Sequence, residues 1–327
     1  MEENRTGILT YVQDAATVAI AGHVRPDGDC VGSCLALYHY LKQHTDAEVA
    51  VYLEQPGRKL SQLPGAEAIC VALPEEIPAV DVFFVLDCGD VERLGFAQEL
   101  YQKAAKTVCI DHHVTNTAFA EETILVPSAS STCELLYEQM EEERISQETA
   151  ECLYTGILHD TGVFHHSCTS PRTMEIAGRL MAKGIDFPRM IDEGFYQRTY
   201  IQNQILGRCL MESMLLWGGL GIVSYLTRDV MEFYGVTPYD LDGVIDQLRL
   251  TAGVEVAIFL YETEEGQSYK VSMRSNGDLD VSKVALYFGG GGHVKAAGCT
   301  MKGSVYDVIN NLTEQLDHQL VTLGKLS

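Results

Sequence analysis

Four short stretches of the sequence place aspartate and histidine side chains where an apolar run ends or close to the end of an expected helix. Carboxylates and imidazoles without a thiolate suit Mn²⁺, while Co²⁺, Fe²⁺ and Zn²⁺ are also compatible and Mg²⁺ fits less well. Two such ions about 3.5–4 Å apart can stabilise the attacking and the leaving oxygen of a phosphoryl displacement. The stretches therefore predict a centre for two divalent metal ions, and their residues are His23, Asp27, Asp29, Asp87, Asp111, His112, His113 and Asp160.

Most of these residues also have an ordinary structural explanation when each is taken alone. Asp29 could cap a helix, and Asp87 could begin a turn. The pair His112–His113 is harder to explain in this way, because neighbouring side chains of a strand point to opposite faces. Burying both imidazoles without partners would cost about 1–3 kcal/mol for each unsatisfied group. The complete set therefore favours a site over a collection of structural residues.

The elements that would position these residues alternate between short apolar strands and helices in the first half of the chain. Continuous apolar runs of this kind are typical of a parallel sheet that is covered by helices on both faces. Ligands of such sheets bind at the carboxyl ends of the strands. We therefore expect one shared crevice, to which Asp160 is added from a helix. The expected strands are 17–23, 47–53, 80–88 and 106–113, and the expected helices are 29–44, 131–143, 147–160 and 171–183.

The second half of the chain shows a different pattern. Residues 187–216 look like helical connectors, and strands near 220–226, 253–262 and 267–274 precede a final helix at 304–321. The predicted fold class is α/β, with a parallel-sheet domain joined by a helical linker to a smaller mixed α/β domain. The predicted boundaries are 1–190 for the first domain, 191–217 for the linker and 218–327 for the second domain.

Composition limits the kinds of partner and location. The formal net charge of −23 argues against long nucleic acids, which require a basic track. No apolar run reaches the roughly 18 residues of a membrane span, and the amino terminus does not resemble a signal peptide. The ten cysteines form no CxxC pair and lie mostly in apolar runs. Reduced core cysteines in a cytoplasmic protein are therefore expected.

The sequence resembles the DHH phosphoesterase superfamily in five motifs that occur in the expected order. These motifs are HVRPDGDCVGS, LDCGD, IDHH, LHDTGVF and the carboxyl-terminal MRSNGDLDVSKVALYFGGGGHVKAAG. The last motif resembles the substrate-binding domain that is associated with the DHH domain. The resemblance covers nearly the whole chain and is closest to the stand-alone bifunctional oligoribonucleases and pAp phosphatases.

The resemblance implies a role for each residue of the candidate centre. His23, Asp27 and Asp87 would hold one manganese ion, and Asp29, Asp87, His112 and Asp160 would hold the other, so that Asp87 bridges the two. Asp111 would orient the neighbouring metal ligand, and His113 would act in catalysis by facing the scissile phosphate.

The glycine-rich run near the carboxyl terminus has two interpretations. A glycine cluster is usually a flexible loop, and this one is not a Walker loop because no Lys-Ser/Thr follows it. The resemblance favours the alternative, in which backbone N–H groups and nearby cations bind a substrate phosphate. The substrate-binding residues implied in this way are Arg274, Ser275, Gly289, Gly290, Gly291, Gly292 and His293.

The function implied by the resemblance is manganese-dependent hydrolysis of very short nucleotides. Oligoribonucleotides of two to five nucleotides would yield 5′-mononucleotides, and 3′-phosphoadenosine 5′-phosphate (pAp) would yield AMP. One alternative is a phosphodiesterase for cyclic di-AMP or its linear product pApA. Another is a catalytically silent nucleotide-binding sensor, which is disfavoured because every motif position is filled. The sequence leaves open whether the protein is a monomer or a homodimer.

Overall fold

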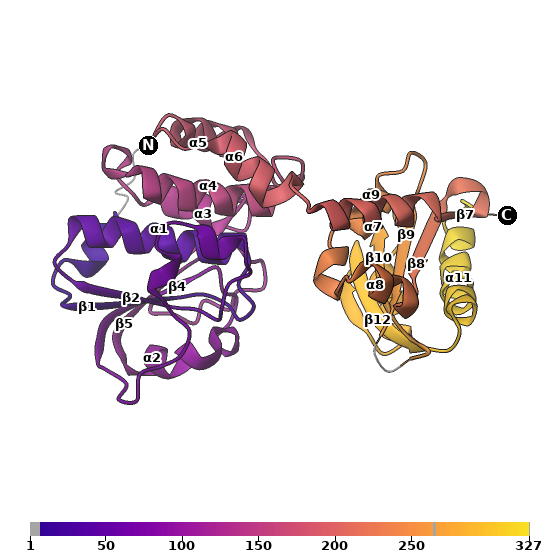
Figure 1. The fold of residues 1–327 in the computed structure, drawn as a ribbon. Helices are drawn as coiled ribbons and strands as arrows, with labels where there is room; N and C mark the ends of the chain where they lie inside the picture. Colours follow the sequence, from indigo (N-terminus) through magenta and orange to yellow (C-terminus); the bar gives the residue numbers. More distant parts are fainter. Residues whose placement is uncertain (1–6, 264–265, 327) are drawn as a thin grey trace. The chain divides into compact units, whose positions relative to one another are not determined.

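The computed structural model describes residues 7–263 and 266–326 of the chain. The chain forms two compact units, the first ending at Gln197 and the second beginning at Arg198. Each unit contains its own six-stranded sheet, so the predicted α/β fold class is confirmed (Figure 1). Of the helices in the described part of the chain, none is long and apolar enough to cross a membrane.

The first unit is built on a parallel sheet in which β1 lies between β2 and β4. The strand order is β3-β2-β1-β4-β5-β6, and every neighbouring pair is parallel. The chain therefore winds outwards in both directions from the β1–β4 pair, which is where such sheets bind their ligands. The strands are β1 Thr17–Ala21, β2 Glu48–Tyr52, β3 Ile69–Cys70, β4 Val80–Leu86, β5 Ala104–Asp111 and β6 Glu122–Leu125.

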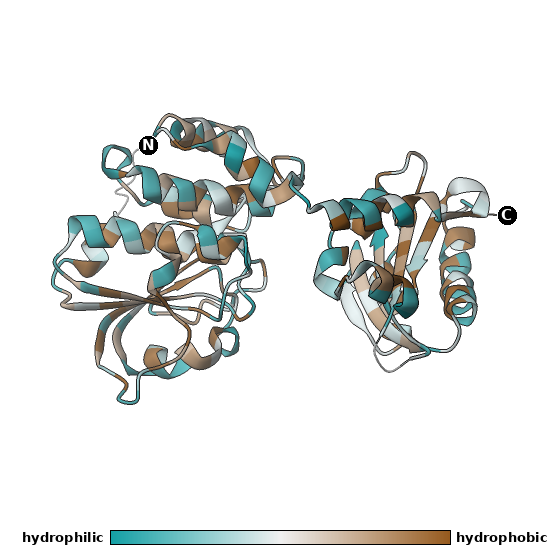
Figure 2. Ribbon diagram, in the orientation of Figure 1, coloured by the Kyte–Doolittle hydropathy of each residue, from teal (hydrophilic) through white to brown (hydrophobic). Residues whose placement is uncertain are grey.

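Helices cover both faces of this sheet, and this explains why its central strands are apolar on both sides. On β4, Phe84 packs into the core beneath the helical layer of α1, α3 and α4, while Phe83 packs into the core on the face of α2. Figure 2 shows the corresponding hydrophobic colour along the central strands. The helices of the unit are α1 Gly28–His44, α2 Gln98–Lys103, α3 Thr132–Glu138, α4 Gln147–Thr161, α5 Pro171–Met181 and α6 Phe187–Ile191.

The second unit contains a mixed sheet with the order β11-β12-β10-β9-β8-β7. Only the β8–β9 pair is parallel, and the other neighbouring pairs are antiparallel. The strands are β7 Met214–Leu216, β8 Gly221–Leu226, β9 Val256–Glu262, β10 Ser268–Ser275, β11 Gly291–His293 and β12 Ala296–Lys302.

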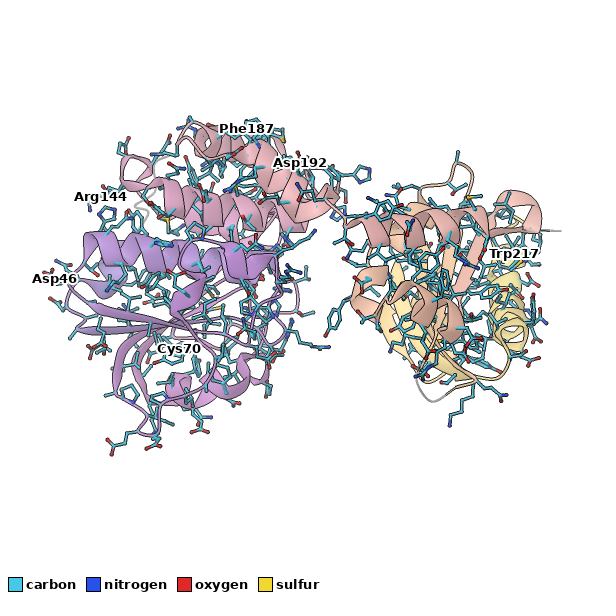
Figure 3. The ribbon with its side chains drawn as sticks, in the orientation of Figure 1. Asp46, Cys70, Arg144, Phe187, Asp192 and Trp217 are labelled. Atoms are coloured by element: carbon cyan, nitrogen blue, oxygen red, sulfur yellow. The ribbon has the colours of Figure 1, made fainter. Side chains whose placement is uncertain are left out.

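Two separate cores lie on the two faces of the second sheet. One forms beneath α10 and α11, and the other forms between α7, α8, α9 and the strands β8 and β9. Trp217, labelled in Figure 3, donates a hydrogen bond from Nε1 to Asp317 on α11. The helices are α7 Tyr200–Met211, α8 Arg228–Tyr234, α9 Val244–Arg249, α10 Val281–Tyr287 and α11 Val305–Thr322.

The segment 191–217, expected as a helical linker, is shared between the two units. Its first part forms the single π-helical turn η6, Asp192–Tyr196, whose Phe195 packs on the core of the first unit. Helix α7 belongs to the second unit, and β7 joins the second sheet as an edge strand. The prediction that 187–216 is helical throughout was therefore wrong at its end, where Met214 to Leu216 pair with β8.

Candidate metal centre

The candidate metal centre lies in the first unit, at the carboxyl ends of β1 and β4, where the sheet changes its winding direction. His23 follows β1 and Asp87 follows β4, and both are almost completely buried. Nε2 of His23 lies 3.5 Å from Oδ2 of Asp87. Asp87 has a positive φ of 54°, which aspartate tolerates better than most residues. The sheet topology therefore brings these two predicted residues together.

Asp27 and Asp29 enter the same centre from the beginning of α1. Asp27 caps this helix by accepting hydrogen bonds from the backbone N–H groups of Asp29 and Cys30. Its Oδ1 also lies 3.7 Å from Nε2 of His23. Burial opposes ionisation of Asp27, but the hydrogen bonds from His23 and Cys30 outweigh it and lower its pKa to about 2. Asp27 is thus an N-cap and a member of the charged cluster at once.

Asp29 is completely buried at the base of the centre. Its two carboxylate oxygens accept hydrogen bonds from the backbone N–H groups of Thr132 and Cys133, at 2.6 and 2.9 Å. These groups lie in the first turn of α3, where helix N–H groups have no partner within the helix. Burial, followed by the charges of Asp87 and Asp160, raises the pKa of Asp29 well above its ordinary value. A cation near this carboxylate would relieve that repulsion.

His112 connects the end of β5 to the last turn of α4. Its Nε2 lies 3.0 Å from Oδ2 of Asp160, 3.6 Å from Oδ1 of Asp87 and 3.9 Å from Oδ2 of Asp29. Burial lowers the pKa of His112, but the hydrogen bond to Asp160 and the nearby carboxylates together raise it to about 10. The three carboxylates predicted to hold the second ion therefore surround Nε2 of His112, the fourth predicted ligand.

Both predicted metal-binding histidines are oriented by a backbone carbonyl. Nδ1 of His23 is 2.8 Å from the carbonyl oxygen of Val24, and Nδ1 of His112 is 3.3 Å from that of Ala129. A proton on Nδ1 donates to these carbonyls, so Nε2 faces the carboxylates and is the nitrogen that a metal ion would bind. Metal-binding histidines are commonly held in this way.

Asp111 was expected to orient the neighbouring metal ligand, and its side chain contacts the ring of His113 together with the backbone of both histidines. Its Oδ1 lies 2.7 Å from Nδ1 of His113 and also accepts hydrogen bonds from the backbone N–H groups of His112 and His113. Its Oδ2 accepts from Nδ2 of Asn116 at 2.6 Å. The hydrogen bond to Asp111 raises the pKa of His113. Oδ1 of Asp111 is engaged by Nδ1 of His113. The ring of His112 therefore contacts the backbone carbonyl of Ala129 through its Nδ1.

The donor set fits divalent cations by its charge as well as its geometry. Within the described residues, the ion pairs of Asp27, Asp29, Asp87 and Asp160 all involve histidine, and none involves lysine or arginine. Close carboxylates without a fixed cation repel one another in a buried site. The structure thus concentrates negative charge that metal ions could neutralise.

Three groupings of these side chains have ligand atoms within 4.8 Å of one another. One grouping combines Asp29, His112 and Asp160, and a second combines Asp87, His112 and His113. The third combines His23, Asp87 and Cys30. His113 and Cys30 were not predicted as metal ligands from the sequence, and spacing alone gave no signal that the buried thiol lies beside His23.

Thr132 is another residue of the centre that the sequence analysis missed. Its Oγ1 donates to Oδ1 of Asp87 at 3.1 Å, in addition to its backbone contact with Asp29. A sequence signal existed, because Ser131 and Glu134 have the spacing of a helix start and Ser131 caps α3. The helix expected over 131–143 begins at this signal, but its position in the sequence did not show that its first N–H groups lie beside Asp29.

The predicted substrate-binding residues lie on β10, on β11 and directly before β11 in the second sheet. Arg274 on β10 pairs with Ala296 on β12, which in turn pairs with His293 on β11. Nε of Arg274 also lies 3.4 Å from Oδ1 of Asp246 on α9. Ser275 is buried, and its Oγ donates to the carbonyl of Gly277.

The glycine run is partly a strand, rather than only the loop that composition suggested. A Cβ on Gly290 or Gly292 would lie 2.2 or 2.5 Å from a carbonyl oxygen of β12. These two glycines therefore permit the close approach of β11 to β12. Gly289 and Gly291 have open space at the Cβ position, so these two positions leave backbone accessible to a ligand.

Comparisons with known proteins agree with this architecture. Residues 17–157 match the model of the DHH family, N-terminal domain, and residues 221–322 match that of the DHHA1 domain. The bifunctional oligoribonuclease and PAP phosphatase NrnA of Thermus thermophilus is 32% identical over 94% of this chain and 92% of its own. Its counterpart from Bacillus subtilis is 26% identical, with coverage of 91% and 93%.

A solved structure shows the same fold across nearly the full chain. The crystal structure of an exopolyphosphatase-related protein from Bacteroides fragilis superposes with a TM-score of 0.84 at 26% identity and covers 96% of this chain and 95% of its own. Cyclic-di-AMP phosphodiesterase GdpP of B. subtilis is 26% identical over 94% of this chain, which spans 48% of that protein. Together with the motif geometry, these matches show that the chain belongs to the DHH family, with a DHH domain followed by a DHHA1 domain.

Proposed function

We propose that the protein hydrolyses phosphoester bonds of very short nucleotides with the help of two divalent metal ions, best fitted by Mn²⁺. The observation that carries the proposal is the convergence of four carboxylates and two oriented imidazoles without a lysine or arginine partner among the described residues. The full-length relatives named as oligoribonuclease and PAP phosphatase support the choice of short oligoribonucleotides and pAp as substrates.

The proposed metal ligands divide into two groups that share Asp87. His23, Asp27 and Asp87 would hold one ion, and Asp29, Asp87, His112 and Asp160 would hold the other. When bound, the ions would neutralise charge on the phosphoryl oxygens and promote ionisation of water. Thr132 restrains Asp87 through its hydroxyl, and the N–H groups of α3 hold Asp29.

We assign His113 to the substrate. Its Nδ1 is fixed by Asp111, so its Nε2 is the nitrogen available to a phosphate oxygen. The raised pKa of His113 favours a cationic ring that donates hydrogen bonds to an anion. Asp111 acts as the positioning residue, because it fixes both the ring and the backbone of the His112–His113 pair.

We assign the second unit, from Arg198 onwards, to substrate binding and the first unit to catalysis. Arg274, Ser275, His293 and the glycines at 289–292 would bind a phosphate or base away from the scissile bond. We also propose a cytoplasmic location, because all ten cysteines are free.

A second candidate function is hydrolysis of cyclic di-AMP or pApA, which the similarity to GdpP favours. A kinetic panel with pAp, pApA, short oligoribonucleotides and cyclic di-AMP under Mn²⁺ separates the two. Higher kcat/KM on pAp and the oligonucleotides supports the first proposal, and higher kcat/KM on cyclic di-AMP supports the second. Failure to hydrolyse any of them with Mn²⁺ would indicate a silent nucleotide-binding protein.

A further inference from the structure

One face of the second sheet is covered by helices on only half of its width. On β9, Ala257 and Phe259 are buried beneath the helices α7 to α9. The neighbouring strand β10 presents Lys270, Ser272 and Arg274 on the same face, because these residues pair with Tyr261, Phe259 and Ala257. All three are exposed or only partly buried, whereas the alternating Val271 and Met273 are fully buried in the opposite core.

The register of the sheet extends this open face across β12 and β11. Ala296 and Gly298 of β12 lie opposite Arg274 and Ser272, and Gly291 of β11 lies opposite Gly298. Directly paired residues of antiparallel strands point to the same face. The floor between the polar side chains is therefore made of alanine, glycine and serine, which leaves room above the sheet.

Basic side chains lie at the edges of this floor. His293 and Arg274 are separated by two strand spacings, about 10 Å between backbones, and Arg274 and Lys270 are separated by four residues along β10, about 13 Å. Arg274 already pairs with Asp246 at 3.4 Å. No described acidic side chain forms an ion pair with Lys270, which is exposed. In a chain of net charge −23, an exposed lysine that has no acidic partner among the described residues marks a local site for an anion.

We infer that Lys270 binds a further phosphate of a bound oligonucleotide, beyond the one assigned to Arg274 and His293. This inference rests on the proposed function, because it concerns the same substrate class. pAp carries both of its phosphates on one ribose and is too short to use the whole floor. A 5′-phosphorylated trinucleotide carries an additional phosphate a further nucleotide away. Lys270 therefore contributes to discrimination between these ligands by length.

The test measures binding to the full-length protein in EDTA, so that neither metal ions nor hydrolysis contributes. Equilibrium dialysis compares pAp with 5′-phosphorylated tri-adenylate for the native protein and for Lys270→Gln. The matched control is Lys283→Gln, since Lys283 is an exposed lysine on α10 whose Nζ lies 3.4 Å from Asp280. We expect Lys270→Gln to reduce the affinity ratio of trinucleotide to pAp about three- to fivefold, as for an exposed charge pair. The control should leave this ratio unchanged.

Salt dependence gives a second readout that loss of structure would not mimic. Removing one phosphate contact should make the slope of log affinity against log salt for the trinucleotide less negative by about 0.7. An unchanged affinity ratio and slope in Lys270→Gln would overturn the inference, and so would a native protein that does not bind the trinucleotide in EDTA. Manganese-dependent hydrolysis of pAp by the native protein, measured separately, tests the proposed function without involving Lys270.

Discussion

Nε2 of His112 lies 3.0 Å from Oδ2 of Asp160 and joins the end of β5 to the last turn of α4. The same nitrogen is within 4 Å of Asp87 and Asp29, which come from the end of β4 and the beginning of α1. One imidazole therefore meets carboxylates from three other elements. Single substitutions in the centre should therefore have distinguishable effects, some on metal content and others on turnover.

Asp87→Asn should abolish hydrolysis and weaken binding of both metal ions. Asparagine tolerates the positive φ of 54° at this position, so the substitution removes the charge without straining the backbone. Turnover of pAp and metal content after dialysis against Mn²⁺ check the two effects separately, and the thermal unfolding temperature in EDTA checks that the variant is folded. Two tightly bound ions with near-native turnover would contradict the bridging assignment of Asp87.

His112→Ala and His113→Ala should fail in different ways. The His112 substitution removes a metal ligand and should lower the metal content. The His113 substitution should leave the metal content near normal and reduce kcat, because its Nδ1 is occupied by Asp111. Mass spectrometry of bound metal and steady-state kinetics on pAp distinguish the two variants. Loss of metal only in His113→Ala would mean that the roles of the two rings are reversed.

Arg274→Ala should reduce kcat/KM on pAp without changing metal content. Loss of one charged hydrogen bond corresponds to about 1.5–3 kcal/mol. Arg249→Ala is a suitable control, because Arg249 lies on the same helix as Asp246 and donates to Asn276. Hydrolysis of bis-p-nitrophenyl phosphate, which lacks a second phosphate, should suffer less in Arg274→Ala. Equal losses on both substrates would show that Arg274 shapes the metal centre itself.

The metal-free protein should lose stability above neutral pH through its histidines. Folding raises the pKa of His23 to about 11 and that of His112 to about 10. The stabilisation from a raised pKa is complete below the unfolded value of about 6.5 and is lost as the pH rises through the folded value. Urea unfolding in EDTA measures the free energy of unfolding of the native protein and of His112→Gln. The difference between the two should decrease from pH 7 to pH 10. A difference that is constant or increases with pH would contradict the prediction.

Gly28→Ala should destabilise the protein through a contact with His159. A Cβ at this position would lie 2.0 Å from Cγ of His159, whose ring also packs on Phe195. We expect a loss of about 1–3 kcal/mol in the free energy of unfolding. Gly178→Ala in α5 is the control, because its Cβ would meet open space, and it should stabilise by about 0.4–1 kcal/mol.

Gly28→Ala in a His159→Ala background tests whether the ring of His159 causes the loss of stability. Removing the ring should recover most of the stability that Gly28→Ala loses, because the clash then disappears. Chemical unfolding of the two single variants and the double variant measures this coupling. Additive effects in the double variant would show that His159 is not the obstacle.

The sequence allowed most residues of the candidate centre to be grouped, because they lie at the ends of strongly apolar strands. Parallel strands bring their carboxyl ends to one edge, so His23, Asp87 and His112 could be grouped before any geometry was known. The partners Thr132 and Cys133 could not be found in this way, since their contact with Asp29 depends on how α3 packs. The ring partner of Asp111 was also beyond the sequence, because adjacent histidines offer it two nearly equivalent nitrogens.

The second unit was less predictable for a related reason. Its short strands β7 and β11 carry glycine or lie at sheet edges, and their pairing depends on neighbours far away in the sequence. Composition suggested a loop at Gly289 to Gly292, whereas the structure uses Gly290 and Gly292 to bring β11 against β12. The role of Gly290 and Gly292 became clear only from the position of β12, whose carbonyl oxygens leave no room for a Cβ.

The most direct test of the central claim is the ratio of kcat/KM for a dinucleotide to that for a 24-mer under Mn²⁺. We expect kcat/KM to fall from short to long substrates, with a ratio of about tenfold or more, equivalent to about 1.4 kcal/mol. The physical reason is that a long strand would extend over a protein of net charge −23 without a basic track. The salt dependence on the short substrates should be shallow, with a slope of about −1 to −2. Faster cleavage of the 24-mer, or a steep salt slope on the dinucleotide, would contradict the proposed specificity for short substrates.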